Sequence, residues 1–289
     1  MPVIDAHHHF WDPARADYPW LTDELAAIRR AFGVEDLRPM LEREGIDGSI
    51  LVQTRSSIDE SVEFLEMAAA TPFIVGVVGW VDLRAPDVAR DIARLQAAPG
   101  GEKLVGIRHQ VHDEADPDWL AREDVRAGIS AVGAAGLAYD LLVRERELPA
   151  AIALVRSMPD VRFVIDHLAK PRIREAILEP WASRIGEVAA FPNVTAKLSG
   201  LVTEADWASW RTEDLRPYVD HAIEVFGPDR LMFGSDWPVC LLAAPYGTVL
   251  ETARALTASL DEEGRAAVFG GTAIRTYRLE DGIPGSDAA

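Results

Sequence analysis

Three consecutive histidines, His7, His8 and His9, follow a short apolar run near the start of the sequence. Side chains on a β-strand alternate between its two faces, so His7 and His9 should share one face while His8 takes the other. Two imidazoles at this spacing suit metal ligation or polarisation of a carbonyl oxygen. If the shared face is the interior of a barrel, both rings point into its mouth; a cluster on the surface is the alternative.

A carboxylate occupies a comparable position near the other end of the chain. Asp236 closes an apolar run, and Pro238 ends the strand that this run predicts. A carboxylate at a strand end can accept a proton from water or bind a cation, whereas the alternative is a cap of the following helix. The first and last strands of a closed barrel are neighbours, so we expect Asp236 to face His7 and His9.

His167 is a further candidate, because it stands at the end of an apolar run directly after Asp166. It continues the alternation of Phe163 and Ile165 and can therefore point inward. A structural hydrogen bond is the alternative for a single histidine at a strand end.

Arg108 ends the expected fourth strand and shares a face with Leu104 and Gly106, while Val105 would face the helices. Its guanidinium could bind the carbonyl or carboxylate of a substrate through two hydrogen bonds, or it could form a buried salt bridge. Weaker candidates for substrate contact stand at equivalent strand ends: Gln53, Trp80 and Asp140.

Other reactive residues have less support. Lys197 either reaches the same site or forms a salt bridge, and a structural or surface role is expected for His109, His112 and His221. No Gly-x-Ser-x-Gly stretch indicates a serine nucleophile. Cys240, the single cysteine, excludes an internal disulfide and fits a reducing compartment; nothing marks it as an activated thiolate.

Eight short apolar runs must position these residues, and amphipathic segments separate most of them. The expected strands are Val3–His7, Gly48–Gln53, Phe73–Val81, Leu104–His109, Leu137–Leu142, Val161–His167, Asn193–Ser199 and Arg230–Asp236. The expected helices include Asp59–Ala70, Pro86–Ala97, Trp119–Ala135, Glu147–Met158 and Asp214–Phe226. Alternating strands and helices predict parallel strands with helical crossovers. Eight such units in 289 residues favour a closed (β/α)8 TIM barrel with its active site at the C-terminal strand ends.

Composition narrows the class of protein. The net charge is −18, from 29 basic and 47 acidic residues, which disfavours nucleic acid and anionic membranes as partners. No glycine-rich phosphate-binding motif follows the first strand. The sequence shows neither a signal peptide nor an apolar run of about 20 residues, so we expect a cytoplasmic protein. We expect residues 1–280 to form a single domain and residues 281–289 a frayed tail.

Two long connections, Phe10–Arg30 and Leu201–Arg211, carry aromatic residues. Loops that leave the C-terminal ends of barrel strands build the active site, so both could cover a pocket. The alternative is that their aromatic side chains pack only on the barrel helices.

Together these motifs resemble the amidohydrolase-2 branch of the amidohydrolase superfamily, and within it the sugar-lactonase group that includes fuconolactonase-like and rhamnonolactonase-like enzymes. The resemblance extends from the first strand to the last helix. It is carried by the stretches Ile4–Asp12, Tyr18–Trp20, Gly106–His109, Asp140–Leu142, Asp166–Pro171, Lys197–Leu201, Phe226–Cys240 and Phe269–Ala273.

The resemblance implies a distorted (β/α)8 barrel that hydrolyses a lactone, a cyclic ester, of a sugar acid or related small acid. It places His7, His9 and His167 around the metal or the lactone carbonyl and makes Asp236 a metal ligand and the general base. Arg108 would orient the substrate. Relatives with two metals need a histidine ending strand five and a lysine or glutamate on strand four. Here those strands offer Asp140 and Arg108, which favours one divalent ion such as zinc, or none.

Two other activities remain open at this point. A metal-dependent decarboxylase of the same superfamily branch would use a similar barrel, and a barrel without catalytic activity would only bind a metabolite or a partner. The sequence is compatible with a small-molecule lactone as the partner and with a homo-oligomer.

Overall fold

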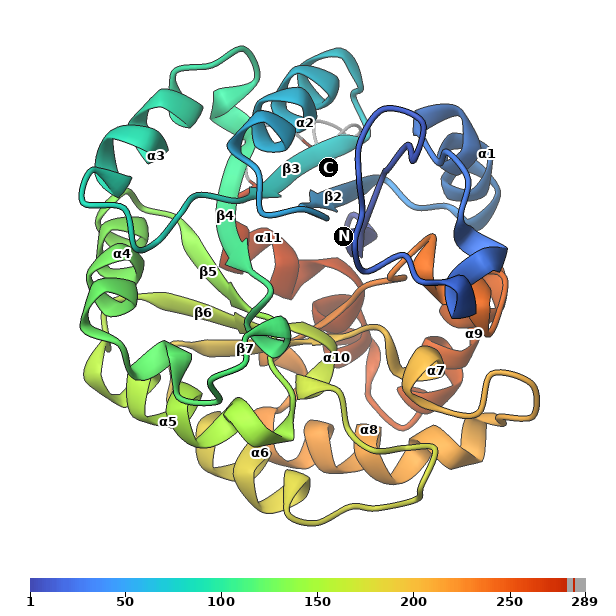
Figure 1. Ribbon diagram of the computed structural model, residues 1–289. Coiled ribbons are helices and arrows are strands. Elements are labelled where there is room, and N and C mark those ends of the chain that lie inside the picture. The colour runs from blue at the N-terminus through green and yellow to red at the C-terminus, as the bar shows by residue number, and fades with distance from the viewer. Residues whose placement is uncertain (280–282, 284–289) are drawn as a thin grey trace.

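Eight parallel strands form a single sheet in sequential order, which curls into a nearly closed barrel (Figure 1). The computed structural model describes residues 1–279 and residue 283, so the predicted tail at residues 281–289 lies outside the described residues except for Ile283. The strands are β1 Ile4–His8, β2 Gly48–Val52, β3 Ile74–Gly79, β4 Leu104–His109, β5 Ala138–Leu141, β6 Arg162–Ile165, β7 Val194–Leu198 and β8 Leu231–Phe233. The expected (β/α)8 class is confirmed.

Helices surround the strands on the outside, as Figure 1 shows for α3 to α6 and α8. They are α1 Val34–Glu44, α2 Ile58–Ala70, α3 Val88–Gln96, α4 Glu123–Ala134, α5 Leu148–Ser157, α6 Trp181–Ala189, α7 Leu201–Glu204, α8 Thr212–Phe226, α9 Tyr246–Leu256, α10 Glu262–Ala266 and α11 Thr272–Tyr277. Local sequence explains several of their ends. The hydroxyl of Ser57 accepts the N–H of Glu60 at the start of α2, and Gly45 ends α1 with a left-handed φ of 69°.

The apolar core has two layers. The larger one lies between the strands and the outer helices, and it includes Phe163 and Ile165. The smaller one fills the barrel interior with residues such as Ile50, Val52 and Val164. Tyr277 at the end of α11, together with Leu279 and Ile283, joins this interior layer, so the C-terminal segment packs against the barrel core.

A β-bulge in β1 decides which residues of that strand face inward. Asp5 pairs with Ser49 and His8 pairs with Leu51, so three steps along β1 match two along β2. The extra residue resets the alternation of faces. As a result Ile4 and Ala6 belong to the interior layer, and His7 also points into the barrel.

A similar irregularity in β4 reverses part of the predicted pattern. The register with β3 shifts at the start of β4, between the pairs Val77–Leu104 and Val78–Gly106. Leu104 therefore packs in the outer layer and Val105 in the interior layer. The expectation that Leu104 shares the inward face and Val105 faces the helices is wrong, because strict alternation does not hold across the shift.

Among the described residues, no helix is both long enough and apolar enough to cross a bilayer. The first long connection folds compactly over the barrel rim: Trp11 is buried, and its indole N–H donates to the carbonyl of Ile28. The Trp11 and Trp20 rings meet edge to face at 5.0 Å. Trp207, in the second long connection, is 38% exposed.

Candidate active site

Three imidazoles and one carboxylate converge at the C-terminal mouth of the barrel. The Nε2 atoms of His7 and His9 lie 3.1 Å apart. Asp236 Oδ1 lies 3.8 Å from His7 Nε2, 3.5 Å from His9 Nε2 and 3.8 Å from His167 Nε2. All four residues are buried. Side chains from β1 and from the segments that directly follow β1, β6 and β8 thus share one small space, and their catalytic roles stay predictions.

The junction of β1 with the segment after β8 brings this group together. Asp236 N donates to the carbonyl of His7 at 2.8 Å, and His9 N donates to the carbonyl of Trp237 at 2.7 Å. These two backbone bonds join the first and last strands at the level of the cluster. Asp236 therefore faces His7 and His9, as expected from the neighbouring positions of the two strands.

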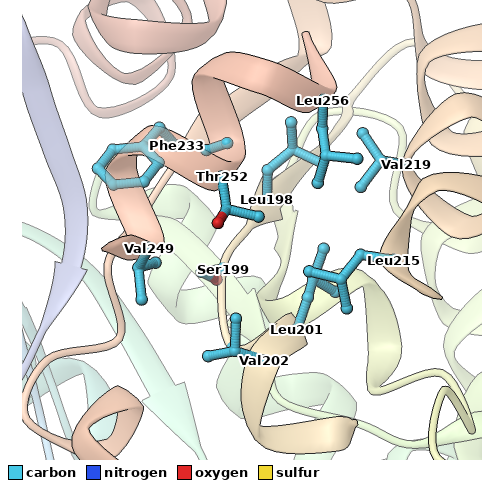
Figure 2. A pocket seen from close by; sticks show the side chains of 12 residues that line it. Leu198, Ser199, Leu201, Val202, Leu215, Val219, Phe233, Val249, Thr252 and Leu256 are labelled. Atoms are coloured by element: carbon cyan, nitrogen blue, oxygen red, sulfur yellow. The ribbon is translucent and has the colours of Figure 1, made fainter. Parts of the chain in front are cut away.

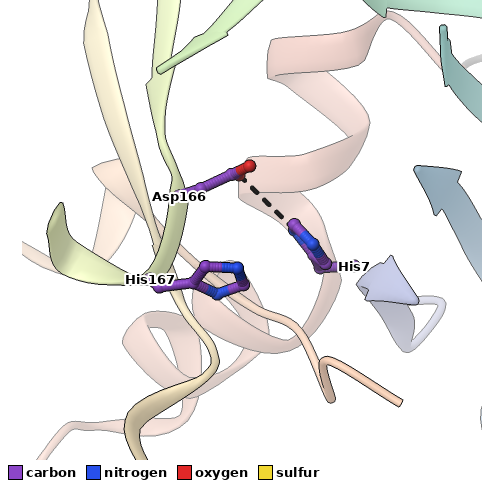
Figure 3. A group of neighbouring side chains, drawn as sticks. All are labelled: His7, Asp166 and His167. Atoms are coloured by element: carbon purple, nitrogen blue, oxygen red, sulfur yellow. Dashed lines mark ion pairs between the residues drawn. The ribbon is translucent and has the colours of Figure 1, made fainter. Parts of the chain in front are cut away.

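His167 reaches the cluster from a turn and not from a strand. The strand β6 ends at Ile165, and the following residues His167 to Lys170 all have positive φ, between 49° and 59°. The expectation that His167 continues the alternation of Phe163 and Ile165 is wrong, because those two residues pack in the outer layer. The left-handed turn instead brings the imidazole of His167 to within 4.5 Å of the ring of His7, centroid to centroid (Figure 3).

Ser199 and Gly200 complete the support of His167. The Oγ of Ser199 lies 2.8 Å from His167 Nδ1, which leaves Nε2 directed at Asp236. Gly200 has a φ of 64°, and a Cβ at this position would lie 2.6 Å from His167 Nδ1. Both the backbone conformation and the close approach therefore require glycine here.

A buried ionic network lies directly beneath His7. Lys197 Nζ contacts Asp140 Oδ2 at 2.6 Å, Asp166 Oδ1 at 2.9 Å and His7 Nδ1 at 3.2 Å. Arg108 Nη1 contacts the other oxygen of Asp166 at 2.9 Å. Two cations and two carboxylates thus balance one another in a region with no solvent exposure of Lys197, Asp140 or Asp166.

The network sets the charge of its carboxyl groups. Burial alone would raise the pKa of Asp166, but Lys197, His7 and Arg108 together hold it well below its usual range. Burial raises the pKa of Asp140 to about 6, although Lys197 opposes the shift. In the sequence, Asp166 stands out only as the neighbour of His167. Strand alternation with His167 on the inward face would turn Asp166 outward. The structure instead places the Asp166 carboxylate inside the barrel, in contact with Lys197.

Arg108 and Gln53 are bound to each other. Gln53 Oε1 accepts from Arg108 Nε at 3.1 Å and from Nη2 at 2.8 Å, and the Gln53 carbonyl oxygen accepts from Nη2 at 2.5 Å. With Asp166 and His7 on Nη1, protein atoms contact every nitrogen of the guanidinium. Asp140 is likewise held by Lys197 and by the Tyr277 hydroxyl, which donates at 2.7 Å. Substrate contact by Arg108, Gln53 and Asp140 stays a prediction.

Trp80 is half-buried and lies in an aromatic group over β3 and β4. Its indole N–H donates to His109 Nδ1 at 3.0 Å, and His109 Nε2 contacts Glu114 at 2.8 Å. The His109 ring stacks on Trp119 with centroids 4.4 Å apart. Burial lowers the pKa of His109 despite the nearby Glu114. His109 thus holds Trp80 in place, and Trp80 as a substrate contact stays a prediction.

The ring nitrogens are prepared to act as electron-pair donors. His9 Nδ1 donates to the Val52 carbonyl at 2.8 Å, which directs the Nε2 lone pair toward the cluster. Burial lowers the pKa of His7 well below its ordinary value and that of His167 to about 4, so these rings are neutral near pH 7. Burial would raise the pKa of Asp236, but the imidazoles outweigh it, so the carboxylate is ionised.

The donor geometry fits one divalent metal ion. Donor atoms of His7, His9 and Asp236 lie within 4.8 Å of one another. Ligand atoms about 2.0–2.1 Å from a tetrahedral ion are about 3.3–3.4 Å apart, which the separations of 3.1, 3.5 and 3.8 Å approach. A second grouping, His7 with Asp166 and His167, is less suited to a metal, because Lys197 and Arg108 already neutralise Asp166.

Arg108 competes for the same ring nitrogen. Arg108 Nη1 lies 3.3 Å from His7 Nε2. His7 Nε2 can therefore either accept a hydrogen bond from the guanidinium or bind a metal ion. The chain thus supports a divalent metal without fixing which one.

A separate apolar cavity of about 30 Å³ lies behind the cluster, among β7, β8, α8 and α9. Figure 2 shows Leu198, Leu215, Val219 and Phe233 around it, with Ser199 on its wall. Its lining carries no charged side chain, so it backs the support of His167 and offers no chemistry of its own.

The whole chain is similar to several known proteins. The sequence model of the Amidohydrolase family matches residues 4–279. The chain is 42% identical over 289 residues to an L-fucono-1,5-lactonase of Burkholderia multivorans, with 96% of each chain covered. It is also 42% identical over 283 residues to an L-fucono-1,5-lactonase of Burkholderia ambifaria, again with 96% of each covered. A crystal structure of a Burkholderia multivorans amidohydrolase with bound zinc is 41% identical, with a TM-score of 0.91 and coverage of 96% of this chain and 100% of the other.

Proposed function

Because this chain belongs to the amidohydrolase family, we propose that it is a hydrolase that opens a lactone of a sugar acid, with L-fucono-1,5-lactone as the first compound to test. The observation that carries the proposal is the convergence of His7, His9 and His167 on the carboxylate of Asp236. The 42% identity to two L-fucono-1,5-lactonases supports the choice of substrate class.

The reaction follows from the charge state of the cluster. The ionised carboxylate of Asp236 accepts a proton from water, whose oxygen then bonds to the lactone carbonyl carbon. Negative charge develops on the carbonyl oxygen, which His167 can stabilise by donating from Nε2 while its Nδ1 accepts from the Ser199 hydroxyl. The bond between the carbonyl carbon and the ring oxygen then breaks, and the proton passes to that oxygen to give a hydroxy acid. The leaving group of a lactone is its ring oxygen, an alkoxide, so a lactone needs less activation than an amide.

His7, His9 and Asp236 would hold a single divalent ion, with His167 next to them, and we propose zinc. When bound, such an ion polarises a carbonyl oxygen and lowers the pKa of a water molecule. With or without the ion, the hydrogen bond to the Val52 carbonyl fixes His9, and Ser199 orients His167.

A screen of sugar lactones and muconate-type lactones with a pH indicator tests the proposal, with and without chelator. We expect acid release from L-fucono-1,5-lactone. The same screen with detection of carbon dioxide tests the decarboxylase alternative. Solved structures named as decarboxylases are only 16% and 17% identical to this chain and show only the fold. Carbon dioxide release from aromatic acids without any lactone opening would refute the lactonase. A cytoplasmic location and a homo-oligomer stay predictions.

A further inference from the structure

A second pocket, with a volume of about 460 Å³, opens on the same face as the candidate active site. Its walls come from the segments that follow β5, β6 and β7: Arg144, the stretch from Lys170 to Arg174, and the stretch from Thr203 to Trp207. Loops after barrel strands lie at the C-terminal face, where the His7 cluster also lies. Lys170 belongs to the left-handed turn that carries His167, and its charge acts on the His167 ring of the cluster.

The pocket is basic, although the protein carries a net charge of −18. Its lining includes five basic side chains, Arg144, Arg146, Lys170, Arg172 and Arg174, and three acidic ones, Glu145, Glu175 and Glu204. Most of these charges are paired within the protein. Lys170 forms an ion pair with Glu204, Arg146 pairs with Glu147, and Arg172 lies 3.9 Å from Glu175.

Two arginines in this lining have no such partner. Over residues 1–279, no carboxylate lies within ion-pair distance of the side chain of Arg144 or of Arg174. Arg144 and Lys170 both act electrostatically on Asp113 and hold its pKa below the usual range, together with the larger effect of the hydrogen bond from His112. The lining thus carries two more basic than acidic side chains, and a ligand can supply the negative charge that Arg144 and Arg174 lack.

The position of the pocket suggests which anion it takes. Lactone opening produces a carboxylate next to the ionised Asp236, so the two like charges repel each other. The Arg108 guanidinium lies at the cluster, 3.3 Å from His7 Nε2, but Arg108 is only 3% exposed and contacts protein atoms through every nitrogen. Arg144 and Arg174 are exposed and face a space large enough for a six-carbon acid.

We propose that this pocket binds the carboxylate of the ring-opened sugar acid, and that Arg144 and Arg174 supply the cations that recognise it. The inference rests on the proposed lactonase function, because it names the site that receives the product. Guanidinium groups match a carboxylate with paired hydrogen bonds. The exposed face of Trp207, whose indole N–H is bound to the Thr203 carbonyl at 2.9 Å, forms an apolar wall for the carbon chain.

Titration calorimetry with gluconate and sorbitol tests the proposal, because the two probes share a six-carbon polyol chain and differ in the carboxylate. We expect the wild-type protein to bind gluconate at least about 10-fold more tightly than sorbitol. The double variant Arg144→Gln/Arg174→Gln should lose this preference. The matched control Arg94→Gln, which removes one charge from the exposed side of α3, should keep it.

Equal binding of gluconate and sorbitol by the wild-type protein would overturn the proposal, as would an unchanged preference in the double variant. A thermal melt of each variant shows whether it is folded, and the single variants Arg144→Gln and Arg174→Gln replace the double one if it is not. The lactone screen separates the two proposals. Arginine-dependent binding of gluconate without any lactone opening refutes the lactonase alone, whereas lactone opening without that binding refutes the pocket alone.

Discussion

Asp236 combines an ionised carboxylate with three ring nitrogens at 3.5 to 3.8 Å, and no other carboxylate in residues 1–279 has this environment. Asp166 and Asp140, the nearest alternatives, are bound to Lys197. Among these groups, Asp236 alone is free of a cationic side-chain partner and can take a proton from water. At the scale of the residue, the chemistry thus depends on one oxygen atom.

Replacement of Asp236 by asparagine should lower kcat at least about 100-fold, because general-base catalysis contributes roughly 10²–10⁴-fold. Lactone hydrolysis measures the loss, and a thermal melt shows whether the fold is retained. The control Asp220→Asn makes the same change on an exposed position of α8 and should leave kcat unchanged. A variant that kept more than about a tenth of the wild-type kcat would exclude a general-base role for Asp236.

Replacement of Lys197 by methionine should lower the free energy of unfolding by about 3–5 kcal/mol, because it leaves Asp140 and Asp166 buried with one cation fewer. Urea denaturation measures the change. The double variant Lys197→Met/Asp140→Leu removes one charge of each sign and should recover part of the loss. If the single variant lost less than about 1 kcal/mol, the network would not be important for stability.

At the scale of the element, the sequence predicted where strands lie better than which way their side chains point. Each of the eight apolar runs overlaps a strand, and only β1 extends past the expected end, by one residue to His8, because apolar periodicity reflects burial directly. The sequence did not predict the bulges at His7 and Val105 or the turn at His167. These features depend on how neighbouring strands pair. His7 and His9 were expected to share a face, and the bulge explains how they do so while Ile4 and Ala6 also face inward.

The turn after β7 gives a prediction at this scale. Gly200→Ala should lower the free energy of unfolding by about 1–3 kcal/mol, because φ is 64°, and should also reduce activity, because the new Cβ would push against His167. Gly45→Ala is the matched control: its φ is 69°, but nothing lies within 4 Å of the added Cβ. We expect both variants to lose stability in a thermal melt and only Gly200→Ala to lose lactone hydrolysis. Equal activity in the two variants would refute this account of Gly200.

At the scale of the whole molecule, buried neutral histidines make stability depend on pH. Burial lowers the pKa of His8 from 6.5 to about 3, and its ring contacts only the Ser49 hydroxyl among polar groups. The unfolded chain takes up a proton at this position below pH 6.5, while the folded protein does so only near pH 3. Folding is therefore disfavoured increasingly as the pH falls from 6.5 to 3.

His8→Gln should remove one proton from this linkage, so the loss of stability between pH 6 and pH 4 should be smaller by about 1.4 kcal/mol per pH unit. Urea denaturation at several pH values measures the slope. Ser49→Ala is the control, because it removes the hydrogen bond but no titrating group, and it should lower stability without changing the slope. An unchanged slope in His8→Gln would mean that His8 is protonated in the folded protein as readily as in the unfolded chain.

The bonds that close the barrel have a consequence for engineering. Asp236 and His9 donate their amide protons across the junction of β1 and β8, and the same residues carry the reacting side chains. A circular permutation or split version could place new chain ends at many other loops and keep the cluster intact. Any design that loosens this junction separates the Asp236 carboxylate from the imidazoles of His7 and His9. The rate of lactone hydrolysis would therefore report whether the barrel is closed.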